Sequence, residues 1–470
     1  MKIKLYNTLS KKLEEFKPIK PGEVGIYSCG PTVYWNQHIG HLYAYVQWDT
    51  LVRLFKSLGF KTTWVMNITD VGHLTSDGDT GQDKMEKGAE REGLSVWQIA
   101  KLYTLQFLES LQMLNIARPD YLPRATEHIE QQIELIKKIE RKGFAYQTET
   151  GLVFDTSKFP GYAKFANLDL KKQQAGSRVK VDHQKKHPWD FLLWVTNQPK
   201  HVMQWESPWG KGFPGWHIEC TAMSTKYLGE RFDIHTGGRE HISVHHSNEI
   251  AQAYGAFGCQ TANYWLHNDW LNLKGEKMSK SKGKMYLVTD LVEKGYDPMH
   301  FRYLILTSHY RKGLNFSWEG LNSAKTAYEK LLEIVSGLQK NRGDNKIVTR
   351  ESLGKTNNYR EKFLQAMAND LKTPEAIAVI WEIVKSGMTA YDKYDLILDF
   401  DQVLGLKLSQ SLDKKNEIEI PEKVELLGNK REALRIKEKW LEADQARKEI
   451  EKLGWQIVDT EAGPKFKPIV

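Results

Sequence analysis

Two short segments, far apart in the chain, carry side chains suited to holding phosphate groups. His38-Ile-Gly-His41 places two imidazoles where a strand pattern gives way to a helix pattern, and Lys277-Met-Ser-Lys-Ser281 places two lysines on a serine-flanked segment. Imidazoles at a helix N-terminus can donate to phosphate oxygens, and Gly40 lets a base or a phosphate approach the backbone. Lysines stabilise charge that develops on an α-phosphate and on departing pyrophosphate, so positioning and charge suffice for a carboxylate to attack ATP.

These motifs predict an ATP site with four catalytic residues, His38, His41, Lys277 and Lys280. The ATP-binding residues would be His38, Gly40, His41 and Lys280. The alternative is a helix cap with solvated histidines together with a solvated lysine loop. The presence of both motifs in one chain favours the phosphate site.

The three cysteines, Cys29, Cys220 and Cys259, do not identify a metal site by their spacing. No Cys-X-X-Cys motif is present, and isolated thiols are usually buried structural groups. A stronger signal is local, because His245 and Glu249 stand four residues apart on one face of an expected helix, which suits two metal ligands. The rival pairs are His246 with Glu249 and His241 with His245.

The first 70 residues predict the elements that would position these groups. Residues 23–29 and 61–68 are β-rich, and between them apolar residues repeat with a helical period, at Leu51, Leu54, Phe55 and Leu58. A strand, a helix and a strand in close succession predict a parallel sheet of Rossmann type. Such sheets bind ligands at the carboxyl ends of their strands, here around Cys29–His41 and Asn67–Asp70.

The rest of the chain shows several changes of pattern. Helical periodicity covers 85–116, 125–143 and 320–405, whereas residues 144–200, rich in lysine and glutamine, are expected to contain few strands. A strand is expected at 232–235, a helix at 244–256, a basic amphipathic helix at 429–453 and a strand at 455–460. Polar stretches at 340–358 and 409–417 are expected to be loops or linkers.

Composition excludes several classes of protein. The 470 residues include 67 basic and 59 acidic ones, and the formal net charge of +8 excludes a histone-like polycation but allows a local nucleic-acid-binding face. The longest apolar run, Ala376–Trp381, is too short for a bilayer, and no signal-peptide stretch opens the chain, so no membrane partner is expected. Sparse cysteines exclude a disulfide framework and suit a cytoplasmic location. No long hydrophobic seam stands out, so a monomer is expected.

Together the motifs resemble those of the class I aminoacyl-tRNA synthetases, whose two ATP sites carry the sequences HIGH and KMSKS. The chain is most similar to the cysteinyl-tRNA synthetases, over essentially its whole length. The segments that carry this resemblance are Cys29–Tyr34, Asn67–Asp70, Gly215–Cys220, Phe232–His235, His245–Glu249, Asn315–Glu319 and Gly454–Thr460.

The resemblance implies a cysteine–tRNA ligase. Such an enzyme activates L-cysteine with ATP and Mg²⁺ to cysteinyl-adenylate, releases pyrophosphate and transfers cysteine to the 3′ end of tRNA(Cys). The resemblance selects Cys29, Cys220, His245 and Glu249 as ligands of one Zn²⁺ per chain, whereas Cys259 has no matching role. The metal would read the thiol, because a pocket alone rejects serine weakly and zinc binds thiolate far better than neutral hydroxyl.

The same resemblance places Gly30, Thr69, Trp216 and His235 around the substrate cysteine. Three of them have ordinary structural alternatives: Trp216 as core, Thr69 as a helix cap and His235 as a hydrogen-bonded core histidine. Departures from the family pattern occur in three loops near ATP and leave the metal ligands intact: Val71–His73, Thr236–Glu240 and Lys284.

The expected fold is α/β, with a Rossmann-type parallel sheet catalytic domain that contains an inserted connective domain. An α-helical bundle and a small C-terminal anticodon-binding domain would follow. The expected ranges are 1–117 and 203–270 for the catalytic halves, 118–202 for the insertion, 271–320 for the KMSKS and stem-contact region, 321–408 for the tRNA-binding bundle and 418–470 for the anticodon-binding domain.

Cations interleaved with aromatic rings near the C-terminus suit a single-stranded RNA loop, and the candidates are Arg435, Trp440, Arg447 and Trp455. Acidic neighbours leave a solvated, ion-paired helix as the alternative. Two other functions stay open for the chain. A cysteine ligase acting on an amino sugar in thiol biosynthesis would lack the segment 420–470, and a synthetase-like RNA-binding protein without catalysis would not need the intact motifs.

Overall fold

The chain forms two compact units, Met1–Ser409 and Gln410–Val470. The computed structural model describes residues 2–72, 83–167, 184–273, 276–277, 285–341, 350–409, 421–436, 439–460 and 463–468. Within those ranges, no helix is both long and apolar enough to cross a bilayer.

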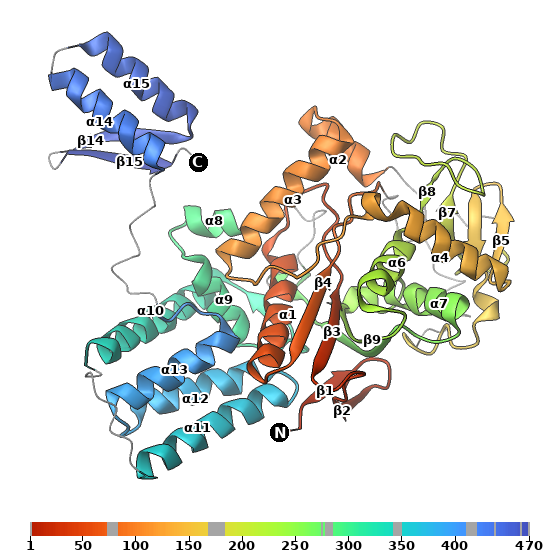
Figure 1. Ribbon diagram of the computed structural model, residues 1–470, viewed down its shortest axis with the longest axis horizontal. Helices are drawn as coiled ribbons and strands as arrows, with labels where there is room; N and C mark the ends of the chain where they lie inside the picture. Colours follow the sequence, from red (N-terminus) through yellow and green to blue (C-terminus); the bar gives the residue numbers. More distant parts are fainter. Residues whose placement is uncertain are drawn as a thin grey trace. The chain divides into compact units, whose positions relative to one another are not determined.

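A four-stranded parallel sheet lies at the centre of the larger unit (Figure 1). Its spatial order is β10-β9-β3-β4, and its strands are β3 (Glu23–Ser28), β4 (Lys61–Met66), β9 (Phe232–Gly238) and β10 (Ala262–Asn268). The βαβ unit expected from the first 70 residues is present, and the Rossmann-type α/β fold is confirmed. Because all four strands run in one direction, their carboxyl ends meet at one edge of the sheet.

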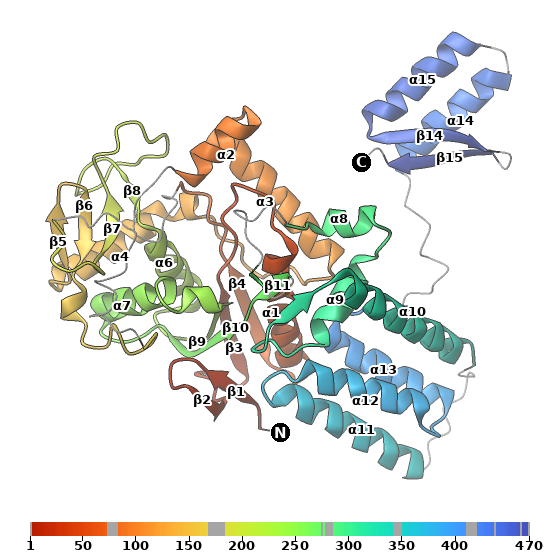
Figure 2. The same ribbon diagram turned by 180° about the vertical axis from the view of Figure 1, so that it is seen from behind.

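Helices cover both faces of this sheet (Figures 1 and 2). On one side lies α1 (Ile39–Ser57), which buries Leu51, Leu54 and Phe55 as its periodicity predicts. On the other side lie α6 (Trp216–Leu228) and α7 (His245–Phe257), which pack against each other. Each of these three helices begins beside the edge where the strands end, so their first turns are available to a site there.

A second sheet has three strands in the insertion and its last strand beyond the expected boundary at residue 202, and it corrects the expectation of few strands at 144–200. Its antiparallel strands pair in the order β5-β6-β7-β8 and span Ala145–Thr148, Gly151–Phe154, Phe191–Val195 and Phe213–Pro214. Strands β6 and β7 are wholly buried. Short, continuously apolar strands show no alternation, and the lysines and glutamines around them dominate the composition of the segment.

Capping residues divide the predicted helical stretches. The stretch at 85–116 forms α2 (Lys84–Glu92) and α3 (Val96–Met113), because Gly93 ends the first in the left-handed conformation and Ser95 caps the second. The stretch at 125–143 forms a 3₁₀ turn (Ala125–His128) followed by α4 (Ile129–Arg141).

The remaining elements of the larger unit complete the helical bundle and two small sheets. The helices are α8 (Val288–Glu293), α9 (Pro298–Leu306), α10 (Trp318–Asn341), α11 (Arg350–Ala368), α12 (Thr373–Lys385) and α13 (Ala390–Leu404). Helix α11 begins inside the expected loop at 340–358, so that loop is shorter than expected. The strands are β1 (Lys4–Asn7), β2 (Lys12–Glu15), β11 (Leu271–Leu273), β12 (Glu276–Lys277) and β13 (Leu314–Phe316).

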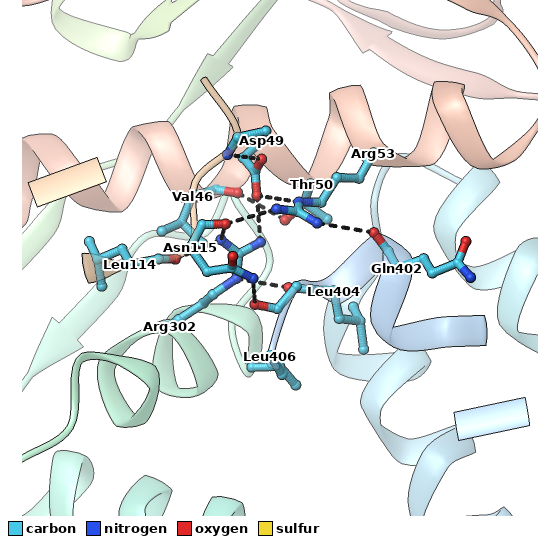
Figure 3. Close-up of polar contacts among 12 residues, drawn as sticks. Val46, Asp49, Thr50, Arg53, Leu114, Asn115, Arg302, Gln402, Leu404 and Leu406 are labelled. Atoms are coloured by element: carbon cyan, nitrogen blue, oxygen red, sulfur yellow. Dashed lines mark hydrogen bonds and ion pairs between the residues drawn. The ribbon is translucent and has the colours of Figure 1, made fainter. Parts of the chain in front are cut away.

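A buried arginine joins α1 to the helical bundle (Figure 3). Arg302 on α9 donates Nη2 to Asp49 Oδ2 at 2.5 Å, and Arg53 Nε donates to the same oxygen at 2.8 Å. The other nitrogens of Arg302 donate to the carbonyl oxygens of Leu114, Asn115 and Leu404 at 2.8–3.0 Å. Asp49 lies on α1 and Leu404 ends α13, so this Arg302 cluster (Arg302, Asp49 and Arg53) fixes the helix that starts at the first motif.

The smaller unit contains two helices where a single one was expected at 429–453. They are α14 (Glu422–Ile436) and α15 (Trp440–Lys452), and they pack on a hairpin of β14 (Trp455–Thr460) and β15 (Gly463–Pro468). Val424, Ile450 and Ile457 form the core. Folding back the second helix buries apolar side chains of both helices against the hairpin, which one continuous helix would not allow.

Candidate active site and metal centre

A cavity of about 340 Å³ lies at the carboxyl edge of the central sheet. Its wall includes the loop Cys29–Gln37 after β3, the first turn of α1, and Gly237 with Gly238 at the end of β9. Trp216 and His245, from the first turns of α6 and α7, close another side. The position agrees with the general rule for ligand sites in parallel sheets.

The first motif forms the N-terminus of α1 and lines this cavity. His38 is the N-cap, and its Nδ1 accepts the Gly40 N–H at 3.0 Å. The exposed His41 stacks on His38 with ring centroids 3.8 Å apart. A Cβ at Gly40 would lie 2.8 Å from His38 Cε1, so glycine permits the cap. The structure thus brings His38, Gly40 and His41 to one wall of the cavity.

The second motif begins on a strand that pairs with a cavity-lining strand. Leu271 of β11 lines the cavity, and β12, which contains Lys277, pairs with β11 through Asn272. After the motif the chain returns to α1, where the Ile39 N–H donates to Tyr286 O at 2.8 Å. The side chain of Lys277 and the whole of Lys280 and Lys284 lie outside the described residues, so their roles stay predictions.

Four buried side chains meet beside the cavity: Cys29 after β3, Cys220 on α6, and His245 with Glu249 on α7. One ligand atom from each lies within 4.8 Å of the others, and we call these four residues the Cys29 cluster. A second set with metal-ligand chemistry shares two members and consists of Cys29, His235, His246 and Glu249. The structure therefore brings two thiols that are distant in the sequence next to His245 and Glu249, the pair of residues that local spacing had identified on one helix.

Hydrogen bonds distinguish the two sets. His235 Nε2 lies 2.8 Å from Glu249 Oε2, and His246 Nε2 lies 3.2 Å from Cys29 Sγ. The other carboxylate oxygen, Glu249 Oε1, lies 3.1 Å from His245 Nε2 and accepts no hydrogen bond from the described residues. The close approach of His245 Nε2 and Glu249 Oε1 without a hydrogen bond fits an arrangement in which both atoms bind the same ion.

Burial sets the electrostatics of the cluster. It raises the pKa of the Cys29 thiol well above its usual range and raises the pKa of the Glu249 carboxyl, although the nearby His235 opposes the second shift. Burial and neighbouring imidazoles lower the pKa of His246, which favours a neutral ring. Removing acids from water disfavours their ionised forms, and a cation among them reverses this preference. The donor atoms present therefore fit a bound metal ion.

The four residues expected around substrate cysteine divide into two pairs. Gly30 and Trp216 line the cavity. A Cβ at Gly30 would lie 1.6 Å from Asn67 O, so the backbone there requires glycine. Thr69 and His235 are buried and do not line the cavity, and Thr69 Oγ1 donates to Glu219 Oε2 at 3.1 Å.

The loops that depart from the family pattern have defined contacts where they are described. Val71 is buried, and Glu240 lines the cavity and accepts a hydrogen bond from Trp270 Nε1 at 2.8 Å. A Cβ at Gly237 would lie 2.5 Å from His246 Cε1, so β9 passes close to the histidines. His73 lies outside the described ranges.

The four expected tRNA-binding residues all lie in the smaller unit. Arg435 pairs with Glu432 at 3.5 Å and Arg447 with Glu451 at 3.4 Å. Trp455 packs against the core, whereas Trp440 is 58% exposed. These contacts are compatible with either interpretation of the segment.

Motif analysis missed several cavity residues, among them Lys84, Asn268 and Trp270. Lys84 stands in a polar segment with other lysines, so neither spacing nor periodicity marks it. Asn268 ends β10 and Trp270 follows it, and knowing that this strand runs parallel to β3 could have placed both at the edge.

Comparison with known proteins assigns the chain to a family. Residues 15–326 match the family model described as tRNA synthetases class I (C) catalytic domain. The cysteine–tRNA ligase of Treponema denticola is 42% identical over 98% of this chain and 99% of its own length. Cysteine–tRNA ligase 1 of Burkholderia lata is 43% identical over 99% and 97%, and a cysteine–tRNA ligase of Thermus thermophilus is 39% identical over 99% and 99%.

Solved structures confirm the fold. Two structures of Mycobacterium tuberculosis methionyl-tRNA synthetase with methionyl-adenylate give TM-scores of 0.56 and 0.57 at 14% and 15% identity. Each comparison covers 82% of this chain and 90% of the other. Family model, relatives and fold agree: the chain belongs to the cysteine–tRNA ligase family of the class I aminoacyl-tRNA synthetases.

Proposed function

We propose that the chain activates L-cysteine with ATP, forming cysteinyl-adenylate and pyrophosphate, and then transfers cysteine to the 3′ end of tRNA(Cys). Membership of the family makes it an ATP-dependent ligase that forms an aminoacyl-tRNA. One observation carries the proposed specificity: Cys29 and His245 belong both to the metal-ligand cluster and to the wall of the cavity that His38 and His41 line.

The first motif is proposed to bind the phosphates of ATP, which enters with Mg²⁺. Since His38 Nδ1 accepts the Gly40 N–H, its Nε2 is the proton-bearing nitrogen and can donate to a phosphate oxygen. The cysteine carboxylate attacks the α-phosphate, and pyrophosphate leaves. Lys277 and Lys280 are proposed to neutralise the charge that develops in this step.

The Cys29 cluster is proposed to hold one zinc ion through Cys29, Cys220, His245 and Glu249. His235 and His246 then act as outer partners that orient Glu249 and Cys29, an arrangement common around protein-bound metals. When bound, zinc supplies a ligand position for thiolate that neutral hydroxyl fills poorly, which distinguishes cysteine from serine. Gly30 and Trp216 would shape the cavity around the substrate, with Thr69 supporting them from behind.

The helical half is proposed to bind tRNA. The bundle at 321–408 would contact tRNA, and the unit at 418–470 would bind the anticodon through Arg435, Trp440, Arg447 and Trp455. The remaining expected boundaries, 1–117, 118–202, 203–270 and 271–320, are proposed as the catalytic, connective and stem-contact parts. We also propose a monomer that works in the cytoplasm.

Two assays test these steps. Cysteine-dependent ATP–pyrophosphate exchange measures adenylate formation, and charging of tRNA with a GCA anticodon measures transfer, with serine as the control amino acid. Both activities with cysteine alone support the proposal. Exchange without charging supports the amino-sugar ligase instead, and absence of exchange contradicts both.

A further inference from the structure

Lys84 is a cavity residue to which no motif assigns a role. It is the first residue of α2, and its Nζ lies 4.7 Å from the centre of the Trp216 ring. Among the described residues that line the cavity, it is the one lysine or arginine. The Trp216 ring also lies 4.7 Å from the ring of His245, so the ammonium group of Lys84 stands near the Cys29 cluster. An anionic part of the substrates would be attracted to a lysine in this position.

The residue before Lys84 fixes the start of α2. Asp83 is buried, its Oδ1 accepts the Glu86 N–H at 2.7 Å, and its Oδ2 lies 2.9 Å from His201 Nε2. A Cβ at Gly72 would lie 2.0 Å from the same Oδ2, so glycine lets the chain after β4 pass this carboxylate. These contacts fix the position of the first turn of α2, which contains Lys84.

Residues near the end of the insertion also contact the first turn of α2. Figure 2 shows α2 between α3 and β8. The ring of His201 stacks on Phe213 of β8 with centroids 3.9 Å apart, and the Val202 N–H donates to Glu86 Oε1 at 2.8 Å. Asp83, Glu86 and His201 have metal-ligand chemistry and lie within 4.8 Å of one another. Their atoms already serve these hydrogen bonds, so we interpret the group as a positioning device rather than a second metal site.

The last turn of α2 is fixed to the cavity as well. The guanidinium of Arg91 lies 3.5 Å from the centre of the Trp35 ring and donates to Tyr34 O at 3.0 Å. Both aromatic residues line the cavity. A Cβ at Gly88 would lie 2.9 Å from Tyr34 O, so helix and loop are in close contact. Both ends of α2 are therefore fixed, and Lys84 stands at the first of them.

We propose that Lys84 binds a phosphate oxyanion of the substrates at the metal end of the cavity, and that the Asp83–His201 pair positions it. The proposal rests on the proposed function, which supplies two phosphates of the same chemistry. One is the α-phosphate of the nucleotide, and the other is the terminal phosphodiester of the tRNA acceptor strand. The two phosphates can be told apart experimentally, because the nucleotide reacts in the activation step and the tRNA in the transfer step.

The test compares Lys84→Met with Lys84→Arg, which keeps the charge, and with Lys87→Met, which removes an exposed lysine from the same helix. Loss of one charge-assisted hydrogen bond is expected to reduce one step about 10- to 100-fold, with partial rescue by arginine and no effect of Lys87→Met. A loss in pyrophosphate exchange assigns the α-phosphate. A loss only in single-turnover transfer from preformed adenylate assigns the tRNA phosphodiester. Losses below about threefold in both steps would overturn the proposal, because they are smaller than one such hydrogen bond supplies.

His201→Gln tests the positioning role. It is expected to reduce the same step as Lys84→Met and to cause no further loss in the Lys84→Met background, because the two act as one unit. Additive losses, with unchanged thermal midpoints, would contradict positioning. If the wild-type enzyme showed no exchange, the proposed function would fail. Equilibrium binding of ATP and of tRNA to wild type and Lys84→Met would still decide whether Lys84 binds phosphate.

Discussion

The Cys29 cluster and the Arg302 cluster are both buried and polar, yet they differ in how their polar atoms are satisfied. The three guanidinium nitrogens of Arg302 donate to one carboxylate oxygen and three carbonyl oxygens. In and beside the Cys29 cluster, Glu249 Oε1 and His235 Nδ1 have no hydrogen-bond partner among the described residues. Burial lowers the pKa of Arg302 and Asp49 opposes that shift, whereas burial raises the pKa of Cys29.

The difference separates a cluster that is satisfied within the protein from one whose unsatisfied atoms fit the proposed metal site. A complete set of hydrogen bonds stabilises a buried charge within the protein itself, so the Arg302 cluster needs no ligand. Acidic groups held close together without compensating charge need a cation to stabilise their ionised forms. Removing one member should therefore abolish metal binding in the Cys29 cluster and destabilise helix packing in the Arg302 cluster.

The largest effect is expected for Cys220→Ser, because a neutral hydroxyl is a poor zinc ligand. Zinc affinity is expected to fall at least about 100-fold, more than for loss of an outer partner. Discrimination between cysteine and serine should fall with it. Metal content after dialysis and exchange with each amino acid measure both effects. The control is Cys259→Ser, which removes a thiol outside the cluster, and full zinc content in Cys220→Ser would refute the ligand assignment.

Arg302→Met should act on stability and leave the metal in place. Breaking this buried ion pair leaves Asp49 with the partly exposed Arg53 as its remaining charged partner, and costs up to about 3–5 kcal/mol. A lower thermal midpoint, together with unchanged zinc content, is the expected result. Arg53→Met provides the control, because the Arg53 side chain is 20% exposed and Asp49 keeps Arg302, so its effect should be smaller. Loss of zinc from Arg302→Met would remove the distinction between the clusters.

Two histidine variants distinguish the overlapping ligand sets. If His245 is a ligand, His245→Asn should lose the metal, while His235→Asn should weaken zinc affinity only about 10- to 100-fold by removing the partner of Glu249. Competition with a chelator measures the affinities. The reverse order would favour the set of Cys29, His235, His246 and Glu249.

Zinc affinity should rise with pH. Burial raises the pKa of Cys29 above its ordinary value of 9.0 and the pKa of Glu249 above its ordinary value of 4.5. The metal-free protein therefore keeps protons on these two groups at pH values where free thiols and carboxyls would lose them. The raised pKa values stabilise the metal-free fold at low pH, where both groups are protonated, and this stabilisation is lost as pH rises and the groups ionise. Metal binding requires the ionised forms. At pH values below 9.0, affinity should therefore increase with pH, up to about tenfold per pH unit for each thiol proton that the metal displaces. Calorimetry in buffers of different ionisation enthalpy counts the protons, and zinc binding without proton release would contradict the raised values.

Local patterns predicted much of the catalytic half. Alternation between strand and helix over the first 70 residues identified β3, α1 and β4, and the step of four residues placed His245 and Glu249 on one helix face. The insertion was predicted poorly, because β6 and β7 are short and continuously apolar. The helix expected over 429–453 was divided because burial against the β14–β15 hairpin overrides local periodicity.

Sequence alone was enough to predict the parallel sheet and, through resemblance, the family, and it supplied the two motifs for which ATP binding is proposed. Tertiary structure decided which distant side chains meet. It brought Cys220 on α6 to Cys29 after β3, placed His235 against Glu249 and put Lys84 into the cavity over Trp216. The physical reason is that periodicity reports which face of an element is buried, whereas contacts between elements depend on how α2, α6 and α7 pack around the sheet.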